Sequence, residues 1–341
     1  MNKNMPFVFL VCSERSGSNL ITRIIDSHPE FCGPSPSHLF RTFSRNLWRY
    51  GNIEEMENWH ILCNDIVDFL NCQLGLWRTR FSMEQIVEEV EQHTLAAVIR
   101  YIYEAEACAN RKSRLFVKEN QTYSFLPFLL ASFPDAKFVF MVRDPRDMSL
   151  SLKLSTATPG GVHRAARLWK TDQENSIEIY GFLRNMGRIW FIRYEDLLSN
   201  TSEELERLCH FLGVDYQTEM LDFYTDELTI KNSKRIEAWH NLENPILKNN
   251  FKKYRTGCSE LEICYIESLC ATEMEILGYR PDFECSNDLA LLETQLLEYE
   301  ENEAFKNIKD IGNDEKVIRA DRISVIERII KRRLWENSSD F

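Results

Sequence analysis

The stretch Phe7–Pro29, FVFLVCSERSGSNLITRIIDSHP, decides the fold of this chain of 341 residues. It begins with the apolar run Phe7–Cys12, whose length and β-branched content are typical of a strand buried on both faces. The polar turn Ser13–Ser18 follows, and the residues after it have the apolar spacing of a helix, at Leu20, Ile21, Ile24 and Ile25. The stretch therefore predicts a strand that turns directly into a helix.

The turn has the composition of an anion-binding loop. A helix N-terminus leaves backbone N–H groups without intrahelical partners, and the helix dipole favours negative charge there. Gly17 lets the backbone approach a ligand, Arg15 supplies positive charge, and Ser16 and Ser18 supply hydroxyl groups. The pattern GxxxxGKS/T is absent, which excludes the nucleotide-triphosphatase loop. For this stretch alone, an ordinary strand–turn–helix corner with a solvated Arg15 remains the alternative.

The composition is that of a soluble globular protein, with 44% hydrophobic and 28% charged residues. A formal net charge of −12 argues against a general nucleic-acid binder. No apolar stretch has membrane-spanning length, and Met1–Pro6 does not read as a secretory signal, so we expect a cytoplasmic protein without a membrane partner. The ten cysteines are scattered, which favours reduced thiols, and the dispersed histidines indicate no metal site.

The rest of the chain alternates between strands and helices after a long helical segment. Residues 42–111 have mainly helical patterning, and we expect them to form a cap inserted into an α/β core. Strands are then predicted at Arg114–Lys118, Lys137–Val142 and Arg188–Arg193, each followed by a helix. This alternation predicts an α/β fold with a central parallel sheet flanked by helices, and ligands at the carboxyl ends of the strands.

Each of these strands ends in polar residues suited to that edge of the sheet. Lys118 ends the first, Arg143 follows the second, and Tyr194 follows the third. Ser151 lies eight residues after Arg143, and the basic segment Lys252–Gly257 comes later in the chain. Taken singly, each of these is an ordinary charged corner or a solvated basic loop.

Together the motifs resemble the sulfotransferases that use 3′-phosphoadenosine 5′-phosphosulfate (PAPS), over about residues 6–281. R-S-G-S-x-L at 15–20 is similar to the 5′-phosphosulfate loop of that family, and Arg143 with Ser151 to its 3′-phosphate pair. Y-E-D-L at 194–197 looks like the segment whose tyrosine contacts adenine, and Arg255 like a late arginine that reaches the 3′-phosphate. The resemblance implies a P-loop-like three-layer fold. It also implies a PAPS site without metal, which releases 3′-phosphoadenosine 5′-phosphate (PAP) and is formed by Arg15, Ser16, Gly17, Ser18, Asn19, Leu20, Arg143, Ser151, Tyr194 and Arg255.

Sulfuryl transfer resembles phosphoryl transfer and has two requirements. Positive charge must stabilise the bridging oxygen as it leaves, and a base must accept the proton of the acceptor. Arg15, Lys118 and the loop amides suit the first role.

The bases usual in the family are missing from this sequence. The cytosolic small-molecule enzymes carry K-T-H where this chain has Lys118-Glu119-Asn120. The protein-tyrosine enzymes carry a glutamate after C-G where this chain has Cys32-Gly33-Pro34-Ser35. His38 and Glu119 are the two nearby candidates, and the sequence leaves the choice between them open.

The favoured function is a PAPS-dependent sulfotransferase (EC 2.8.2 type) of secondary metabolism. It would act on a hydroxyl, or on an amine or guanidinium nitrogen, of a small molecule. The chain generally resembles bacterial natural-product enzymes, for which saxitoxin-type alkaloids are one acceptor class. The alternative is a non-catalytic or regulatory nucleotide-binding protein that kept the anion sites. An unusual P-loop kinase is less favoured, because no aspartate of the Walker-B type follows an apolar strand.

The predicted domain organisation has two parts. Residues 1–283 form the sulfotransferase domain, and residues 284–341 form a helical C-terminal extension. The extension has an acidic helical stretch at 284–310 and a mixed-charge helix at 316–333. We expect these helices to pack on the core, and a homodimer through them is the alternative.

Overall fold

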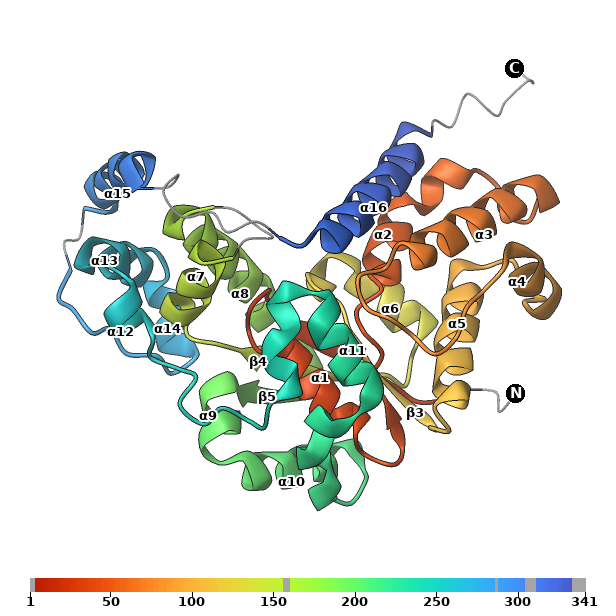
Figure 1. Ribbon diagram of the computed structural model, residues 1–341, viewed down its shortest axis with the longest axis horizontal. Helices are drawn as coiled ribbons and strands as arrows, with labels where there is room; N and C mark the ends of the chain where they lie inside the picture. The colour runs from red at the N-terminus through yellow and green to blue at the C-terminus, as the bar shows by residue number, and fades with distance from the viewer. Residues whose placement is uncertain (1–3, 156–159, 286–287, 304–310, 333–341) are drawn as a thin grey trace.

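The computed structural model describes residues 4–155, 160–285, 288–303 and 311–332. Its centre is a five-stranded parallel sheet in the order β2-β3-β1-β4-β5 (Figure 1). The strands are β1 (Phe7–Cys12), β2 (Phe31–Cys32), β3 (Arg114–Lys118), β4 (Lys137–Val142) and β5 (Ile189–Arg193). The predicted α/β fold with a central parallel sheet is confirmed, and the short β2 is the one strand that the sequence did not predict.

Helices cover both faces of this sheet. Those up to β4 are α1 (Ser18–Asp26), α2 (Leu39–Asn46), η1 (Leu47–Tyr50), α3 (Met56–Asn71), α4 (Met83–Glu89), α5 (Leu95–Ala109), η2 (Thr122–Phe125) and α6 (Leu126–Ser132). The later ones are α7 (Pro145–Lys153), α8 (Val162–Arg184), α9 (Tyr194–Ser199), α10 (Thr201–Leu212), η3 (Thr218–Thr225), α11 (Glu227–Arg235), η4 (Glu237–Glu243), α12 (Tyr254–Gly257), α13 (Glu260–Leu269), α14 (Ala271–Ile276), α15 (Leu289–Glu303) and α16 (Asn313–Lys331).

Strand β1 lies in the middle of the sheet and is buried on both faces. All six of its side chains are buried, and its backbone pairs in parallel with β3 on one side and β4 on the other. Successive side chains of a strand point to opposite faces. Phe7, Phe9 and Val11 therefore pack in one core with α2, α3, α5 and α8, while Val8 and Leu10 pack with α1, α9 and α10.

The helices between residues 42 and 111 belong to the core of the sheet domain. Trp59 and Phe69 of α3 and Ile102 of α5 lie in the same apolar cluster as Phe7 and Phe9 of β1. The segment predicted as an inserted cap therefore packs directly against one face of the sheet.

The described helices of the C-terminal extension contact the rest of the chain at two separate places. Helix α15 packs against α13 and α8, whereas α16 packs against α3 and α2, and Figure 1 shows the two helices on opposite sides of the molecule. Residues 304–310 and 333 onward, which belong to the predicted extension, lie outside the described residues. The division at 283/284 and the homodimer stay predictions. None of the described helices has the length and apolar content needed to cross a membrane.

One pair of cysteines corrects the expectation of reduced thiols. Cys264 in α13 and Cys285, 21 residues later, form a disulfide, with their Cα atoms 5.3 Å apart. The chain folds back on α13 after α14, and this tertiary proximity leaves no short-range spacing motif in the sequence. The other eight cysteines are free, and six of these are buried.

The buried Arg146 joins α7 to α13 and provides a test of the fold. Its guanidinium donates to Asp144 at 2.6 Å and to Glu267 at 2.5 Å, and all three side chains are at most 8% exposed. Arg146→Ala should lower the free energy of unfolding by about 3–5 kcal/mol, because it leaves buried carboxylates without their cation.

Urea denaturation measures this loss, and Arg207→Ala is the matched control. Arg207 pairs with Glu203 and Glu204 on the surface of α10, so its removal should cost at most about 1 kcal/mol. Similar losses for the two variants would contradict the structural role of Arg146.

Candidate active site

The turn after β1 has the backbone geometry of an anion-binding loop. Arg15 and Gly17 have φ values of 61° and 86°, in the left-handed region, and α1 begins at Ser18 directly afterwards. A Cβ atom at Gly17 would lie 2.3 Å from the ring of Tyr194. Only glycine therefore allows the end of β5 to lie this close to the loop.

A pocket of about 700 Å³ opens beside this loop. It collects residues from the carboxyl ends of β1, β3, β4 and β5, as expected for ligand sites in parallel sheets. Ten of the predicted site residues line it, namely Arg15, Gly17, Ser18, Asn19, Leu20, His38, Lys118, Arg143, Ser151 and Tyr194. Ser16, Glu119 and Arg255 do not line it.

Two guanidinium groups lie close together at the loop. The Arg15 Nε donates to the Ser151 Oγ at 2.9 Å, and the Arg143 Nη1 donates to the Arg15 carbonyl at 3.1 Å. Burial, together with the charge of Arg143, lowers the pKa of Arg15. The buried Nε of Arg143 has no hydrogen-bond partner within the described residues. An anion between these groups would relieve their repulsion and use the unpaired donor.

Lys118 and Tyr194 complete this end of the pocket. The Lys118 side chain is buried, and burial lowers its pKa. Its ammonium group donates no hydrogen bond to any residue in the described part of the chain. The Tyr194 ring lies under Arg143, 4.7 Å from its Cζ atom, and the Tyr194 hydroxyl accepts a hydrogen bond from Asn250 at 2.8 Å.

The structure does not bring Arg255 to this site. Its guanidinium pairs with Asp282 at 2.9 Å on the surface and is 53% exposed. The basic segment reaches the pocket through Lys253 instead. Lys253 precedes the short helix α12 and Arg255 lies within it, and only Lys253 of these two lines the pocket. Ser16 also turns away from the ligand side, because its hydroxyl donates to the Ser13 carbonyl at 2.8 Å.

His38 lies at the start of α2 and faces the pocket. Its backbone is left-handed, with φ of 63°, and its buried Nδ1 has no hydrogen-bond partner among the described residues. Burial and the nearby charges of Arg41 and Arg322 hold the pKa of His38 well below its usual value of 6.5. The imidazole is therefore neutral at neutral pH, which is the form that accepts a proton.

Glu119, the other predicted base, lies behind the pocket. Its carboxylate accepts the backbone N–H groups of Phe40 and Arg41 at 3.3 and 3.1 Å, and its side chain is 1% exposed. Burial raises the pKa of Glu119 to about 7. Because successive side chains at the end of a strand point to opposite sides, Lys118 points toward the pocket and Glu119 points away from it. Glu119 therefore caps α2 and positions His38 rather than contacting a ligand.

Several residues that line the pocket were not predicted from the sequence. Glu14 lies in the loop itself, where Asn120 donates to its carboxylate at 3.2 Å. The presence of a carboxylate within an anion-binding loop is visible in the sequence and could have indicated Glu14 as a site residue. Arg41 and the α16 residues have no such signal, because only the tertiary fold brings them to the loop.

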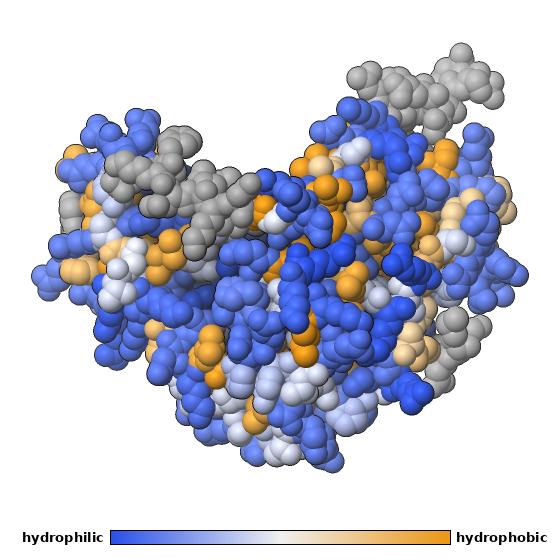
Figure 2. All heavy atoms as spheres, in the orientation of Figure 1, coloured by the Kyte–Doolittle hydropathy of each residue, from blue (hydrophilic) through white to orange (hydrophobic). Residues whose placement is uncertain are grey.

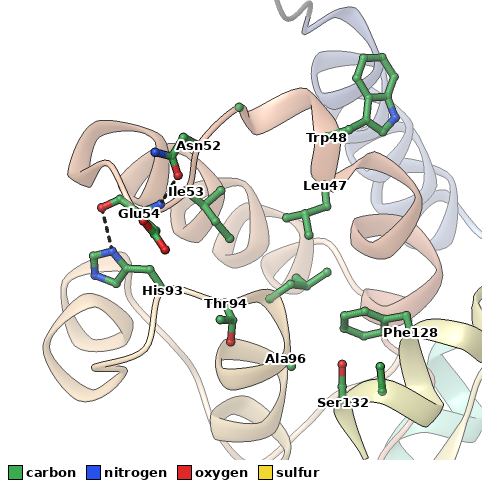
Figure 3. Close-up of a pocket in the computed structure, with 13 residues that line it drawn as sticks. Leu47, Trp48, Asn52, Ile53, Glu54, His93, Thr94, Ala96, Phe128 and Ser132 are labelled. Atoms are coloured by element: carbon green, nitrogen blue, oxygen red, sulfur yellow. Dashed lines mark hydrogen bonds between the residues drawn. The ribbon is translucent and has the colours of Figure 1, made fainter.

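A second hollow, of about 780 Å³, lies among the helices at residues 47–132, away from the loop (Figure 3). Apolar side chains such as Leu47, Trp48 and Phe128 form much of its wall. The Nδ1 atom of His93 lies 3.3 Å from the Glu54 carbonyl. No lysine or arginine lines this hollow within the described residues, so it lacks the charge that a phosphosulfate requires.

The comparison with known proteins decides the family. Residues 6–218 match the model of the sulfotransferase family. The chain belongs to this family. This confirms the family predicted from the loop and the strand ends, and with it the expectation of a sulfotransferase-type enzyme.

Relatives and solved structures of this sulfotransferase are distant. A protein-tyrosine sulfotransferase of Gallus gallus is 25% identical over 227 residues, which cover 64% of this chain and 54% of the relative. The chain thus spans about half the length of that protein. The sulfotransferase domains of the Synechococcus PCC 7002 olefin synthase and of the curacin biosynthetic pathway have TM-scores of 0.56 and 0.57 at 20% and 18% identity. Each match covers 82% of this chain and 98–99% of the domain, and it shows the shared fold.

The raised pKa of Glu119 makes a testable difference to stability. The pKa of Glu119 is about 7 in the folded state, whereas that of an ordinary glutamate is 4.5. The folded protein therefore binds this proton more tightly than the unfolded chain does. The contribution of this carboxyl is therefore fully present below about pH 4.5 and is lost as the pH rises through 7. The melting temperature of the wild type, relative to that of Glu119→Gln, should fall between pH 5 and pH 8 in scanning calorimetry. A constant difference across this range would contradict the assignment.

Proposed function

We propose that this chain transfers the sulfuryl group of PAPS to a hydroxyl or nitrogen of a small-molecule acceptor and releases PAP. The observation that carries the proposal is the convergence of Arg15, Lys118, Arg143 and Ser151 in one pocket at the carboxyl edge of the sheet. The two arginines have no carboxylate hydrogen-bond partner within the described residues, and Lys118 has no hydrogen-bond acceptor there. These cations therefore remain available to a polyanionic donor.

Each part of the donor has a suitable group in the pocket. The N–H groups at the start of α1, with Ser18 and Asn19, suit the phosphosulfate. Arg143 and Ser151 suit the 3′-phosphate, and Lys253 takes the place predicted for Arg255. Tyr194 suits the adenine ring.

The reaction is an in-line displacement at sulfur. The bond from sulfur to the bridging oxygen of PAPS breaks, and a bond from sulfur to the acceptor atom forms. Negative charge develops on the bridging oxygen, and Lys118 and Arg15 stabilise it from fixed positions. The acceptor proton passes to His38, whose neutral imidazole faces the pocket.

The acceptor is a small molecule of secondary metabolism in this proposal. The sulfotransferase domains of the olefin synthase and of the curacin biosynthetic pathway, which share this fold, support that direction. A saxitoxin-type guanidinium acceptor has less support, because Arg41, Arg319 and Arg322 line the pocket and would repel a cation. A cytoplasmic location and a homodimer are parts of the proposal that rest on the sequence alone.

Ligand binding tests the donor. PAP should raise the melting temperature, and ATP with magnesium should raise it much less, because the loop lacks the lysine that binds the outer phosphates of a triphosphate. Arg143→Ala should weaken PAP binding by about 1.5–3 kcal/mol through the loss of charge-assisted contacts. Titration calorimetry measures this loss. Equal, magnesium-dependent stabilisation by ATP would contradict the proposal.

The pH dependence of turnover tests the base. His38→Ala should lower kcat by about 10²- to 10⁴-fold and leave PAP affinity nearly unchanged. The wild-type rate should rise along a limb that lies below pH 6.5, because the pKa of His38 is lowered, and the variant should lack this limb. Glu14→Gln is the comparison, since Glu14 is the carboxylate of the loop. A larger loss for Glu14→Gln would assign the base to Glu14 instead.

A further inference from the structure

The C-terminal helix α16 forms one wall of the pocket that contains the anion-binding loop. It lies at Asn313–Lys331, beyond the residues 6–218 that match the family model. Four of its side chains nevertheless line the pocket, namely Arg319, Arg322, Ile323 and Ile326. In Figure 1 this helix lies beside α2 and α3, on the opposite side of the molecule from α15. A segment outside the family pattern thus contributes to the site.

Hydrogen bonds fix α16 to two parts of the pocket. The Arg322 guanidinium donates to the Ser37 carbonyl at 2.5 Å and lies over the Phe69 ring at 3.8 Å. Near the start of the helix, Glu315 accepts the N–H of Glu237 at 3.1 Å, and Glu237 belongs to η4, which also lines the pocket. These contacts hold the inner face of α16 against the pocket.

The pocket beside α16 has an excess of positive charge. Burial and the nearby charges of Arg41 and Arg319 lower the pKa of Arg322 to about 10. Arg319 pairs with Glu315 at 2.6 Å. In the hydrogen bonds and ion pairs between described residues, Arg41 takes part only through its backbone, whose N–H binds Glu119.

The carboxylates that line the pocket, Glu14, Asp147 and Glu237, are fewer than its arginines and lysines. The Glu315 carboxylate forms an ion pair with Arg319. The Glu119 carboxyl, whose pKa is raised to about 7, is partly protonated at neutral pH. Elsewhere in the pocket, Asp147 accepts the backbone N–H groups of Lys252 and Tyr254. The Arg41 guanidinium therefore remains available to bind a ligand.

Apolar side chains lie next to these charges. Ile323 and Leu154 are 56% and 69% exposed, although both line the pocket together with Ile326 and Leu74. Figure 2 shows apolar side chains gathered on the flank of the central hollow beside α16. Exposed apolar side chains inside a concave site are typical of a ligand-contact surface.

We infer that α16 forms one wall of the acceptor subsite, which selects acceptors that combine an apolar body, packed on Ile323 and Ile326, with an anionic group that Arg41 binds. This inference rests on the proposed function, because the other end of the pocket is assigned to PAPS. A carboxylate or a phosphate on the acceptor would form charge-assisted hydrogen bonds with the Arg41 guanidinium. A cationic acceptor would face like charges.

The test uses the full chain saturated with PAP and a panel of small phenols and alcohols. Each compound is supplied as the carboxylic acid, the phosphate ester, the neutral amide and the amine. Titration calorimetry should give the better of the two anionic forms a Kd about 10- to 100-fold below that of the amide. The comparison of acid with phosphate ester identifies the anionic group. Arg41→Gln should reduce this preference, because glutamine carries no charge, and should change the Kd of the amide much less than that of the anionic forms.

Arg328→Gln is the matched control on the same helix. Arg328 pairs with Asp65 and Asp68 and does not line the pocket, so this variant should keep the wild-type preference. Equal or tighter binding of the amides or amines would overturn the inference. So would a lack of binding by both anionic forms, or a preference that survives in Arg41→Gln.

PAP binding separates failure of this inference from failure of the proposed function. If PAP does not stabilise the wild type, the proposed function fails. If PAP binds and the anionic forms are not preferred, the acceptor subsite alone fails. Loss of PAP binding in Arg41→Gln would place Arg41 at the donor end and overturn its assignment here.

Discussion

The close contact between Gly17 and the Tyr194 ring is the constraint on which the site depends. The space for a Cβ atom at Gly17 is already filled by that ring, which would lie 2.3 Å from such an atom. The contact places the end of β5 directly on the loop after β1. Because Arg143 stacks on the same tyrosine, the end of β4 is brought there too. Backbone geometry at one glycine thus gathers three strand ends around a single anion site.

The partners of the arginines distinguish binding groups from structural ones. Arg146 is neutralised by Asp144 and Glu267, so its charge is used within the fold. Arg15 and Arg143 instead bond to a serine hydroxyl and to backbone carbonyls, which leave their charges intact. A site for a polyanion requires the second arrangement, because a carboxylate partner would have to be displaced before the ligand could bind.

The sequence predicted those parts of the structure that depend on local pattern. The bounds of β1, β3 and β4 were predicted correctly, because a buried parallel strand is a continuous apolar run, and β5 begins one residue later than expected. The two-residue β2 is too short for any periodicity. The Cys264–Cys285 disulfide, the surface ion pair of Arg255 and the inward turn of Glu119 all depend on how distant segments meet. No spacing of residues in the sequence indicates these contacts between distant segments.

The position of His38 shows how such distant segments control the chemistry proposed here. Glu119, at the end of β3, accepts the first N–H groups of α2, and Arg322, from α16, binds the carbonyl of Ser37. His38 lies between these two contacts, so the core sheet and the C-terminal helix hold it from both sides. In the proposed reaction the loop and the strand ends within residues 6–218 bind the donor, whereas α16, outside that match, forms part of the acceptor end. A chain with the same loop and strand ends but another segment in place of α16 would then bind the same donor and a different acceptor.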